Sequence, residues 1–306
     1  MRFSLGLPTD RVDRPEEFVT GDAIMECAAA AELLGFDACF VTDHPAPDTK
    51  WLAVGGHHAL DPMVALAFAA ASTTRLQLQT HIMVLAYRNP LLAAKSVLSL
   101  DVLSGGRVLL GVAAGYLRPE FGALGVEFEE RNALTDEAID VIRGVFAEDE
   151  LVYDGLHFRT RGTAMRPKPA RGTAPPIWIG GNSKSAIRRA VDRGDGWVPF
   201  PNPPSAGLAA RTPVLGTIEE FAERMAYLRD YAEAVGRTER IDICFHPFSM
   251  THDYDVAAVA DELEQLAALG VTWCVLGTPH AGTRAEYIAH ATRIAEDVVK
   301  PAASRR

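Results

Sequence analysis

The feature that most constrains the fold of this 306-residue chain is a regular alternation of short apolar runs with longer segments of helical periodicity. Strands that alternate with helices indicate a parallel sheet, because each parallel connection needs a crossover, which is usually a helix. Eight runs have the length and composition of strands, at about 3–7, 37–41, 75–79, 107–113, 177–179, 196–200, 241–245 and 271–276. Eight such units are compatible with a closed barrel or with an open, doubly wound sheet.

The segment after the first predicted strand favours the barrel. A doubly wound sheet often carries a Gly-x-Gly-x-x-Gly loop there, whereas this chain continues as Leu7-Pro8-Thr9-Asp10. No break in composition divides the chain into two parts. We therefore predict a single α/β domain over residues 1–306, folded as a (β/α)8 TIM barrel of ordinary length for that fold.

One segment, approximately residues 147–176, interrupts the alternation after the fourth strand. Asp154-Gly155 lies between the apolar runs 151–153 and 156–158, which is a hairpin signal. A run rich in proline and arginine follows, from Arg166 to Pro176. We interpret this segment as an insertion over the mouth of the barrel.

Charge and composition narrow the class of partner. The formal net charge is -10, so the chain repels phosphate backbones and we expect no nucleic-acid partner. No apolar run reaches membrane-spanning length and no secretory signal is evident, so we expect a cytoplasmic protein without a membrane contact. Four cysteines lie in apolar runs without Cys-x-x-Cys spacing, which predicts reduced core residues: Cys27, Cys39, Cys244 and Cys274.

Polar residues that follow the strands are the candidate site residues, because barrel active sites lie at the carboxyl ends of the strands. The second strand runs into Thr42-Asp43-His44, the third into Thr80-His81-Ile82, and the fourth into Gly115-Tyr116 and then Glu120. Strand seven ends at His246. Three histidines at strand ends indicate a polar ligand pocket or a metal site.

The motifs of metal-dependent and serine hydrolases are missing from the sequence. The first strand carries no histidine or carboxylate, and neither His-Glu-x-x-His nor Gly-x-Ser-x-Gly occurs. The adjacent pair His57-His58 is interpreted as solvated loop polarity. We therefore expect no metal ligands.

Gly180-Gly181 precedes a predicted helix and is a candidate phosphate site. Glycines let a ligand approach the backbone, and free N–H groups at a helix N-terminus favour an anion. Nearby positive charge comes from Lys184, Arg188 and Arg189. The alternative, a plain strand-to-helix turn capped by Asn182 or Ser183, is equally compatible with these residues.

Several strings, taken in this order, closely resemble the luciferase-like monooxygenase superfamily over roughly residues 1–300. They are Thr42-Asp43-His44, the segment 100–107 (LDVLSGGR), the segment 111–116 (GVAAGY), the segment 175–181 (PPIWIGG) and the segment 193–197 (RGDGW). Within that superfamily the chain looks most like the actinobacterial oxidoreductases that use the deazaflavin coenzyme F420.

The resemblance implies a cofactor at the carboxyl-terminal mouth of the barrel and, by family analogy, a homodimer. A histidine at the position of His44 touches the deazaflavin in the family's sugar-phosphate dehydrogenase. The family also carries a non-proline cis peptide after strand three, which would fall near Thr80-His81-Ile82, and a phosphate-binding turn that matches Gly180-Gly181. The implied cofactor-binding residues are Asp43, His44, Thr80, His81, Ile82, Gly115, Gly180, Gly181, Asn182 and Ser183.

The chain departs from that dehydrogenase at two positions. The family's acidic residue directly after the glycine is Tyr116 here, and the tryptophan four residues after the histidine is Asp48, with Trp51 three further on. We therefore predict hydride transfer to or from a small organic substrate other than that sugar phosphate, with His44, Tyr116 and Glu120 as catalytic candidates. The alternatives are a monooxygenase that uses flavin mononucleotide (FMN) and a non-catalytic flavin-binding barrel.

Overall fold

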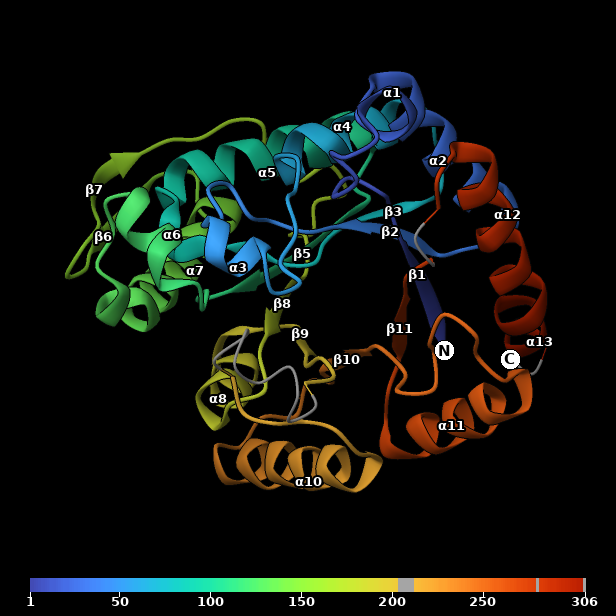
Figure 1. Cartoon of the computed structure of the whole chain (residues 1–306). Coiled ribbons are helices and arrows are strands. Elements are labelled where there is room, and N and C mark those ends of the chain that lie inside the picture. Colours follow the sequence, from blue (N-terminus) through green and yellow to red (C-terminus); the bar gives the residue numbers. More distant parts are fainter. Residues whose placement is uncertain (203–211, 279–280, 305–306) are drawn as a thin grey trace.

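Eight parallel strands close into a barrel in the computed structural model, which describes residues 1–202, 212–278 and 281–304 (Figure 1). Neighbours around the barrel follow the order β3-β2-β1-β11-β10-β9-β8-β5, and β3 pairs with β5 to close it. The bounds are β1 (Arg2–Gly6), β2 (Ala38–Val41), β3 (Gln77–Thr80), β5 (Val108–Ala113), β8 (Ile177–Gly180), β9 (Gly196–Val198), β10 (Asp242–Phe245) and β11 (Trp273–Leu276). The predicted (β/α)8 barrel is confirmed.

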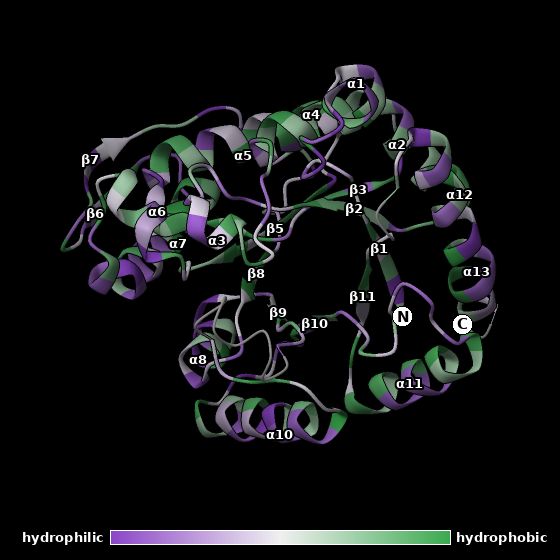
Figure 2. Cartoon of the chain, in the orientation of Figure 1, coloured by the Kyte–Doolittle hydropathy of each residue, from purple (hydrophilic) through white to green (hydrophobic). Residues whose placement is uncertain are grey.

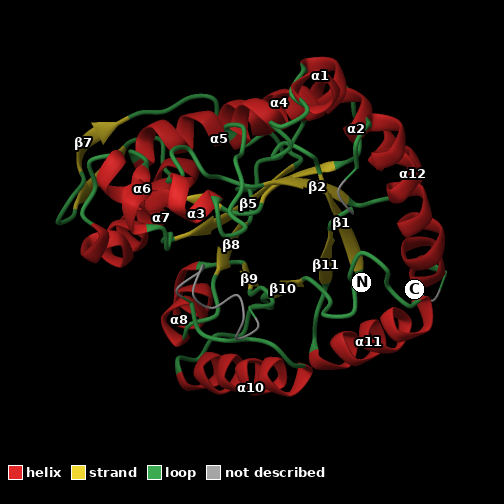
Figure 3. Cartoon of the chain, in the orientation of Figure 1, coloured by secondary structure: helices red, strands yellow, loops and turns green. Residues whose placement is uncertain are grey.

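Helices surround the barrel and run back from the mouth to the opposite end (Figure 3). The long ones are α2 (Gly21–Leu34), α4 (Pro62–Ala71), α5 (Pro90–Ser104), α7 (Arg131–Ala147), α8 (Lys184–Arg193), α10 (Ile218–Ala234), α11 (Val256–Leu269) and α12 (Arg284–Ile294). Shorter elements are α1 (Pro15–Phe18), α3 (Thr49–Leu52), α6 (Arg118–Ala123), α13 (Lys300–Ala303), η1 (Leu85–Tyr87), η2 (Phe128–Glu130) and η3 (Ala295–Val299). Among the described residues no helix combines the length and apolar character needed to cross a membrane.

Capping side chains define several helix starts. The Thr217 side chain accepts from the backbone N–H of Glu220, and Thr283 accepts in the same way from Glu286, so both threonines are N-caps. Helix α7 was not predicted from the sequence, since no helix was expected between the fourth strand and residue 147. It supplies the crossover from β5 toward β8.

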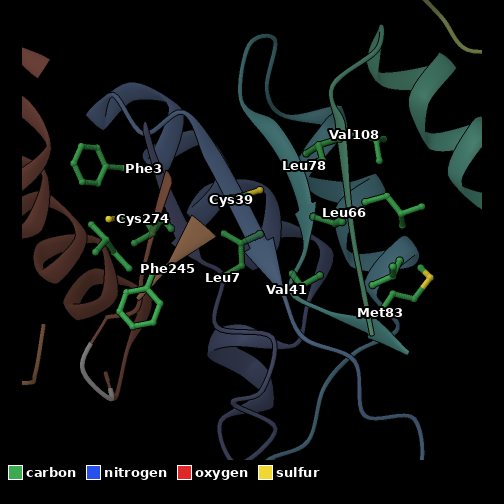
Figure 4. Packing of buried hydrophobic residues seen from close by; sticks show 14 of the residues in the cluster. Phe3, Leu7, Cys39, Val41, Leu66, Leu78, Met83, Val108, Phe245 and Cys274 are labelled. Carbon is green, nitrogen blue, oxygen red and sulfur yellow. The ribbon is translucent and has the colours of Figure 1, made fainter. Parts of the chain in front are cut away.

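The core lies mainly between the strands and the helices, where apolar residues of both pack together (Figures 2 and 4). A smaller group fills the barrel interior, where the rings of Trp178 and Trp273 meet at 5.3 Å. All four cysteines are buried, and none of them forms a disulfide bond, as predicted. Burial raises the pKa of the Cys27, Cys39 and Cys244 thiols to about 12, which disfavours thiolate chemistry.

Two charged residues of the family-like strings hold the end of the barrel opposite the mouth. The buried guanidinium of Arg107 donates to the carbonyl oxygens of Ser104 and Leu76 and to the hydroxyl of Thr73. Asp195 accepts from the backbone N–H of Ile177. These residues support the scaffold at the start of strands and do not line the mouth.

The predicted hairpin after the fourth strand is present, but its predicted position over the mouth is wrong. Strands β6 (Leu151–Asp154) and β7 (Arg159–Thr163) pair antiparallel and lie outside the ring of strands (Figure 1). The chain that follows is tied to the other end of the barrel, because the Ala170 N–H donates to Asp101 near the end of α5. Lys168 likewise donates to the carbonyl oxygen of Val145 near the end of α7.

Candidate active site

A cavity of about 450 Å³ opens at the carboxyl ends of β2, β3, β5 and β8. At one end it is lined by the ring-bearing side chains of His44, His57, His81 and Tyr116, and the bulge residues Ile82 and Val84 continue the lining toward Gly180. At the other end it is lined by glycines, serines and cationic side chains: Gly180, Gly181, Ser183, Ser185, Arg131 and Arg189. The volume lies within the range of small-molecule and cofactor sites.

The three predicted catalytic residues form one chain of contacts. The Tyr116 hydroxyl lies 3.4 Å from Nε2 of His44, and Nδ1 of His44 lies 3.3 Å from a carboxylate oxygen of Glu120. They come from the ends of two strands and a short helix: His44 follows β2, Tyr116 follows β5, and Glu120 lies in α6. Strands β2 and β5 are not neighbours in the barrel, but both flank β3.

Glu120 is the fully buried base of this chain of contacts. Burial opposes its ionisation, but hydrogen bonds from His44, the Ala46 N–H and the Tyr87 hydroxyl outweigh that effect and lower its pKa. An ionised carboxylate only accepts hydrogen bonds, so it selects the tautomer of His44 with the proton on Nδ1. Nε2 is then an acceptor, and the Tyr116 hydroxyl donates to it.

Tyr116 lines the cavity at the end of this relay. Burial, and then the negative charge of Glu120, raises the pKa of its phenol to about 12. The phenol is therefore protonated near neutral pH and offers a proton to a bound molecule. The combination predicted at one face of the barrel is thus assembled in space.

Two further aromatic side chains pack around His44. The Trp51 ring lies 4.4 Å from the His44 ring and the His57 ring lies 4.9 Å from it. Asp48, at the position of the family tryptophan, caps helix α3 by accepting from Lys50 and Trp51 N–H groups. Helix α3 therefore places Trp51 against His44, although this tryptophan comes three residues later in the sequence than the family tryptophan.

The interpretation of His57 as solvated loop polarity is wrong, because its side chain lines the cavity. Burial lowers its pKa, which favours the neutral ring. Sequence spacing could not have revealed this, since His57 lies in the loop between α3 and α4 and its position depends on tertiary packing.

The predicted non-proline cis peptide is present between His81 and Ile82. The segment continues into β4 (Met83–Val84), which pairs with β5 beyond the end of β3. Nδ1 of His81 is buried without a hydrogen-bond partner among the described residues. Burial, reinforced by His246, lowers the pKa of His81 to about 4. The neutral ring of His81 thus forms part of the cavity wall.

Two predicted cofactor contacts from this region serve the protein instead. The Asp43 carboxylate accepts from the Val84 N–H at 3.0 Å and from Arg88 at 2.9 Å. Burial raises the pKa of Asp43, although Arg88 opposes that shift. The Thr80 side chain is buried and donates to the carbonyl oxygen of Gly111. These side chains hold the bulge, and Asp43 is also part of the cavity lining.

At the opposite end, the two glycines bring bare backbone to the cavity wall. A Cβ at position 180 would lie 2.1 Å from the end of the Ile82 side chain, so a larger residue there would force that side chain to move. Gly181 has a φ of 119°, a backbone conformation that side-chain-bearing residues rarely adopt. Gly115, also at the cavity, has a positive φ of 80°. Ser183 then caps α8 by accepting from the Ala186 N–H.

Asn182 does not take part in the cavity lining, contrary to its predicted cofactor contact. Its fully buried side-chain amide donates to the carbonyl oxygens of Phe200 and Pro213 and accepts from the Phe200 N–H. Asn182 therefore connects the glycine turn to Phe200 and to Pro213, and both of these residues line the cavity.

Positive charge gathers at this end from two different helices. Arg189 of α8 lines the cavity and is held by Asp136 and Asn132. Arg131, at the start of α7, lines it as well. In contrast, Arg188 is exposed and donates to Tyr227, and Lys184 also lies against Tyr227. Of the three predicted cations only Arg189 faces the cavity, and Arg131 was missed together with its helix.

Comparison with known proteins places this barrel among oxidoreductases. The family model of the luciferase-like monooxygenases matches residues 1–300, so the chain belongs to that family. A relative from Gordonia bronchialis, an F420-dependent glucose-6-phosphate dehydrogenase, is 30% identical over 73% of this chain and 64% of its own length. An uncharacterised protein of Mycobacterium tuberculosis is 28% identical over 82% of this chain and 83% of its own length.

Solved structures confirm the fold at low sequence identity. A monooxygenase from Streptomyces bottropensis superposes with a TM-score of 0.78 at 19% identity, covering 98% of this chain and 99% of that chain. The coenzyme F420-dependent tetrahydromethanopterin reductase of Methanopyrus kandleri gives 0.73 at 17% identity, covering 98% of each. Since one neighbour is a monooxygenase and the other uses F420, the fold does not distinguish between these activities.

Proposed function

We propose that this protein is an oxidoreductase that binds coenzyme F420 in the 450 Å³ cavity and transfers hydride to or from a small organic substrate. The observation that carries the proposal is the composition of that one cavity. It joins the His44–Tyr116 pair at one end to a glycine turn flanked by two guanidinium groups at the other. A planar ring with an anionic tail matches both ends.

The residues present fit such a cofactor. His81, whose buried Nδ1 has no hydrogen-bond partner among the described residues, forms part of the wall where the ring would lie. Gly180 and Gly181 leave room for close backbone approach, and the start of α8 supplies N–H groups and a positive dipole end. Arg131 adds positive charge, and Arg189 adds a guanidinium that forms an ion pair with Asp136, in a chain whose net charge is -10.

The chain's own residues bind, orient and handle the proton. When bound, the deazaflavin supplies or accepts the hydride. Tyr116 gives a proton to, or takes one from, the substrate oxygen, and His44 relays it while Glu120 keeps the imidazole in the productive tautomer. Trp51 and His57 restrict the movement of His44 and keep water from it.

The choice of F420 over FMN rests on the F420-dependent relative and on the two arginines. Both cofactors carry a phosphate, but F420 also has an anionic polyglutamate tail, which the arginines would attract at long range. The FMN-dependent monooxygenase is the second candidate, favoured by the structural likeness to a monooxygenase. A non-catalytic flavin carrier would not need the buried Glu120 relay.

The test is a pair of fluorescence-quenching titrations with F420 and with FMN, at low and at moderate salt. We expect tighter binding of F420 and a steeper loss of its affinity with salt, because exposed charge attraction is screened within about 8 Å at physiological ionic strength. Arg189→Gln should weaken F420 binding and reduce the salt dependence, whereas Arg188→Gln, on the same helix but directed to Tyr227, should not. Tighter FMN binding with flavin-dependent oxygen consumption would establish the monooxygenase instead.

A further inference from the structure

A second cavity, of about 230 Å³, adjoins the candidate active site at the mouth of the barrel. It lies at the carboxyl ends of β1, β2 and β11, on the side of the barrel away from the glycine turn. The two cavities share Thr42 and His57 in their linings. Because a cofactor held at the glycine turn would occupy the first cavity, the second is the neighbouring space open to another small molecule.

The walls of this second cavity are partly apolar and partly polar. The rings of Phe18 and Phe40 and the methyl group of Ala281 supply apolar surface. Polar groups come from the segment after β1, where Thr9 and Asp10 line the cavity, and from Thr278 after β11. A compact molecule with an apolar body and a few hydroxyl groups would satisfy both kinds of wall.

The charges of this cavity favour a hydrogen-bond donor over an anion. Arg11 is the cation in the lining, but its guanidinium already donates to the carbonyl oxygen of Ala281 and to Asp13. The Asp10 carboxylate makes no hydrogen bond or ion pair within the described part of the chain. The cavity therefore contains a half-buried carboxylate that can accept a hydrogen bond, close to the charges of Arg11 and His57, and a cation that is already engaged.

We infer that the second cavity holds the substrate, that this substrate is a small uncharged molecule with a hydroxyl group, and that Asp10 accepts a hydrogen bond from that group. The inference rests on the proposed function, since it assigns the first cavity to the cofactor. Asp10 is thus a specificity residue that selects hydroxyl donors and repels phosphorylated molecules.

The shared His57 explains how the two cavities would work together. Its ring lies 4.9 Å from the ring of His44 and also forms part of the wall of the second cavity. A molecule anchored at Asp10 therefore lies next to the His44–Tyr116 pair, which handles the proton of the reacting hydroxyl. A second hydroxyl on the same molecule would make the contact with Asp10.

The experiment measures binding by isothermal titration calorimetry, with trans-cyclohexane-1,2-diol as the neutral probe and glucose 6-phosphate as the anionic one. Each titration uses the full chain, both alone and loaded with deazaflavin. In the deazaflavin-loaded protein, where the proposed phosphate turn is filled, we expect the diol to bind and glucose 6-phosphate not to bind. Asp10→Ala should weaken diol binding about tenfold or more, since a hydrogen bond to a charged group is lost. Glu16→Ala, which removes an exposed carboxylate from α1, is the matched control.

The outcomes separate this inference from the proposed function, because deazaflavin affinity is measured first on the same proteins. If the deazaflavin binds but the diol does not, or if Asp10→Ala and Glu16→Ala bind the diol equally, the substrate assignment is overturned and the cofactor assignment stands. Tight binding of glucose 6-phosphate to the deazaflavin-loaded protein would also overturn it. Diol binding that depends on Asp10, without deazaflavin binding, would refute the proposed function alone. Circular dichroism melting of each variant establishes that it is folded.

Discussion

At the scale of single residues, the buried carboxylate of Glu120 determines what the neighbouring groups can do. It is fully buried and accepts from the Ala46 N–H and the Tyr87 hydroxyl, so its charge is held in place by fixed donors. A buried carboxylate without such donors would be protonated instead. Its remaining contact sets the imidazole of His44, and through it the phenol of Tyr116.

The first prediction tests whether these residues form one relay. Glu120→Gln and Tyr116→Phe should each lower the rate of substrate oxidation roughly 10²-fold or more while deazaflavin affinity changes little, because proton transfer is lost and cofactor contacts remain. The double variant should be no worse than the poorer single variant, since the residues act as a unit. Additive losses would show independent roles.

A measurement without substrate complements the kinetics. Nitrogen-15 NMR of the His44 ring should show the proton on Nδ1 in the wild type and a mixture of tautomers in Glu120→Gln. Tyr153→Phe, in the outlying hairpin, is the control and should change neither the rate nor the spectrum.

The second prediction concerns acid stability and His81. Burial lowers the pKa of this ring to about 4, whereas an unfolded histidine titrates near about 6.5. Between these values the unfolded chain binds a proton that the folded chain does not, so stability is complete above pH 6.5 and falls as the pH drops toward 4. The ring contributes roughly 3 kcal/mol to this loss. Urea unfolding of His81→Gln should show a shallower decline over that window, and an unchanged slope would contradict the assignment.

At the scale of elements, the site depends on how strands end and helices begin. After β3, the Asp43 carboxylate holds the bulge that carries His81 and Ile82. After β8, the turn at Gly180-Gly181 leads into α8, and Asn182 connects that turn to the segment after β9. Strand ends thus supply the groups that face the cavity, while their polar neighbours hold the loops in shape.

The third prediction compares two glycines with positive φ. Gly181 lines the cavity and has a φ of 119°. Gly125 follows α6, is not part of the cavity lining, and has a φ of 71°. An alanine at either position costs stability, about 1–2 kcal/mol for the strained backbone. Gly181→Ala should in addition weaken deazaflavin binding at least severalfold, because the methyl group removes close backbone approach. Equal cofactor affinity in the two variants, measured by quenching, would rule out the phosphate turn.

At the scale of the whole molecule, several large apolar side chains on the outer helices are exposed and are not part of the buried core. Val64 and Phe68 of α4 and Leu92 of α5 are exposed, and these two helices pack side by side. Exposed apolar patches on a protein surface commonly mark contacts with other proteins.

The fourth prediction is the homodimer implied by the family resemblance. Light scattering at micromolar concentration should give twice the chain mass of 33.1 kDa. Phe68→Asp should shift the mass toward one chain, because it places a charge on the apolar face of α4. Leu156→Asp, at an exposed apolar position of the distant hairpin, should leave the dimer intact. A single-chain mass for the wild type would show that the analogy does not hold.

The sequence by itself determined the barrel and the positions from which its site is built. Strand and helix periodicity is a local property of the chain, and the eight βα units therefore predicted both the fold and the residues at strand ends, including His44, Tyr116 and Gly181. The family-like strings also predicted the cis peptide at His81–Ile82. The periodicity depends on neighbours in the sequence, whereas the cis peptide was implied by the family resemblance.

Only the tertiary structure decided which polar groups remain available to a ligand. Asp43, Thr80 and Asn182 lie where the sequence predicted contacts, and their side chains also form hydrogen bonds with the protein's own backbone and with Arg88. His57 and Arg131 reach the cavity from a loop and from a helix start. The physical reason is that a hydrogen bond is satisfied by whichever partner packing brings close, and those partners are far apart in the chain.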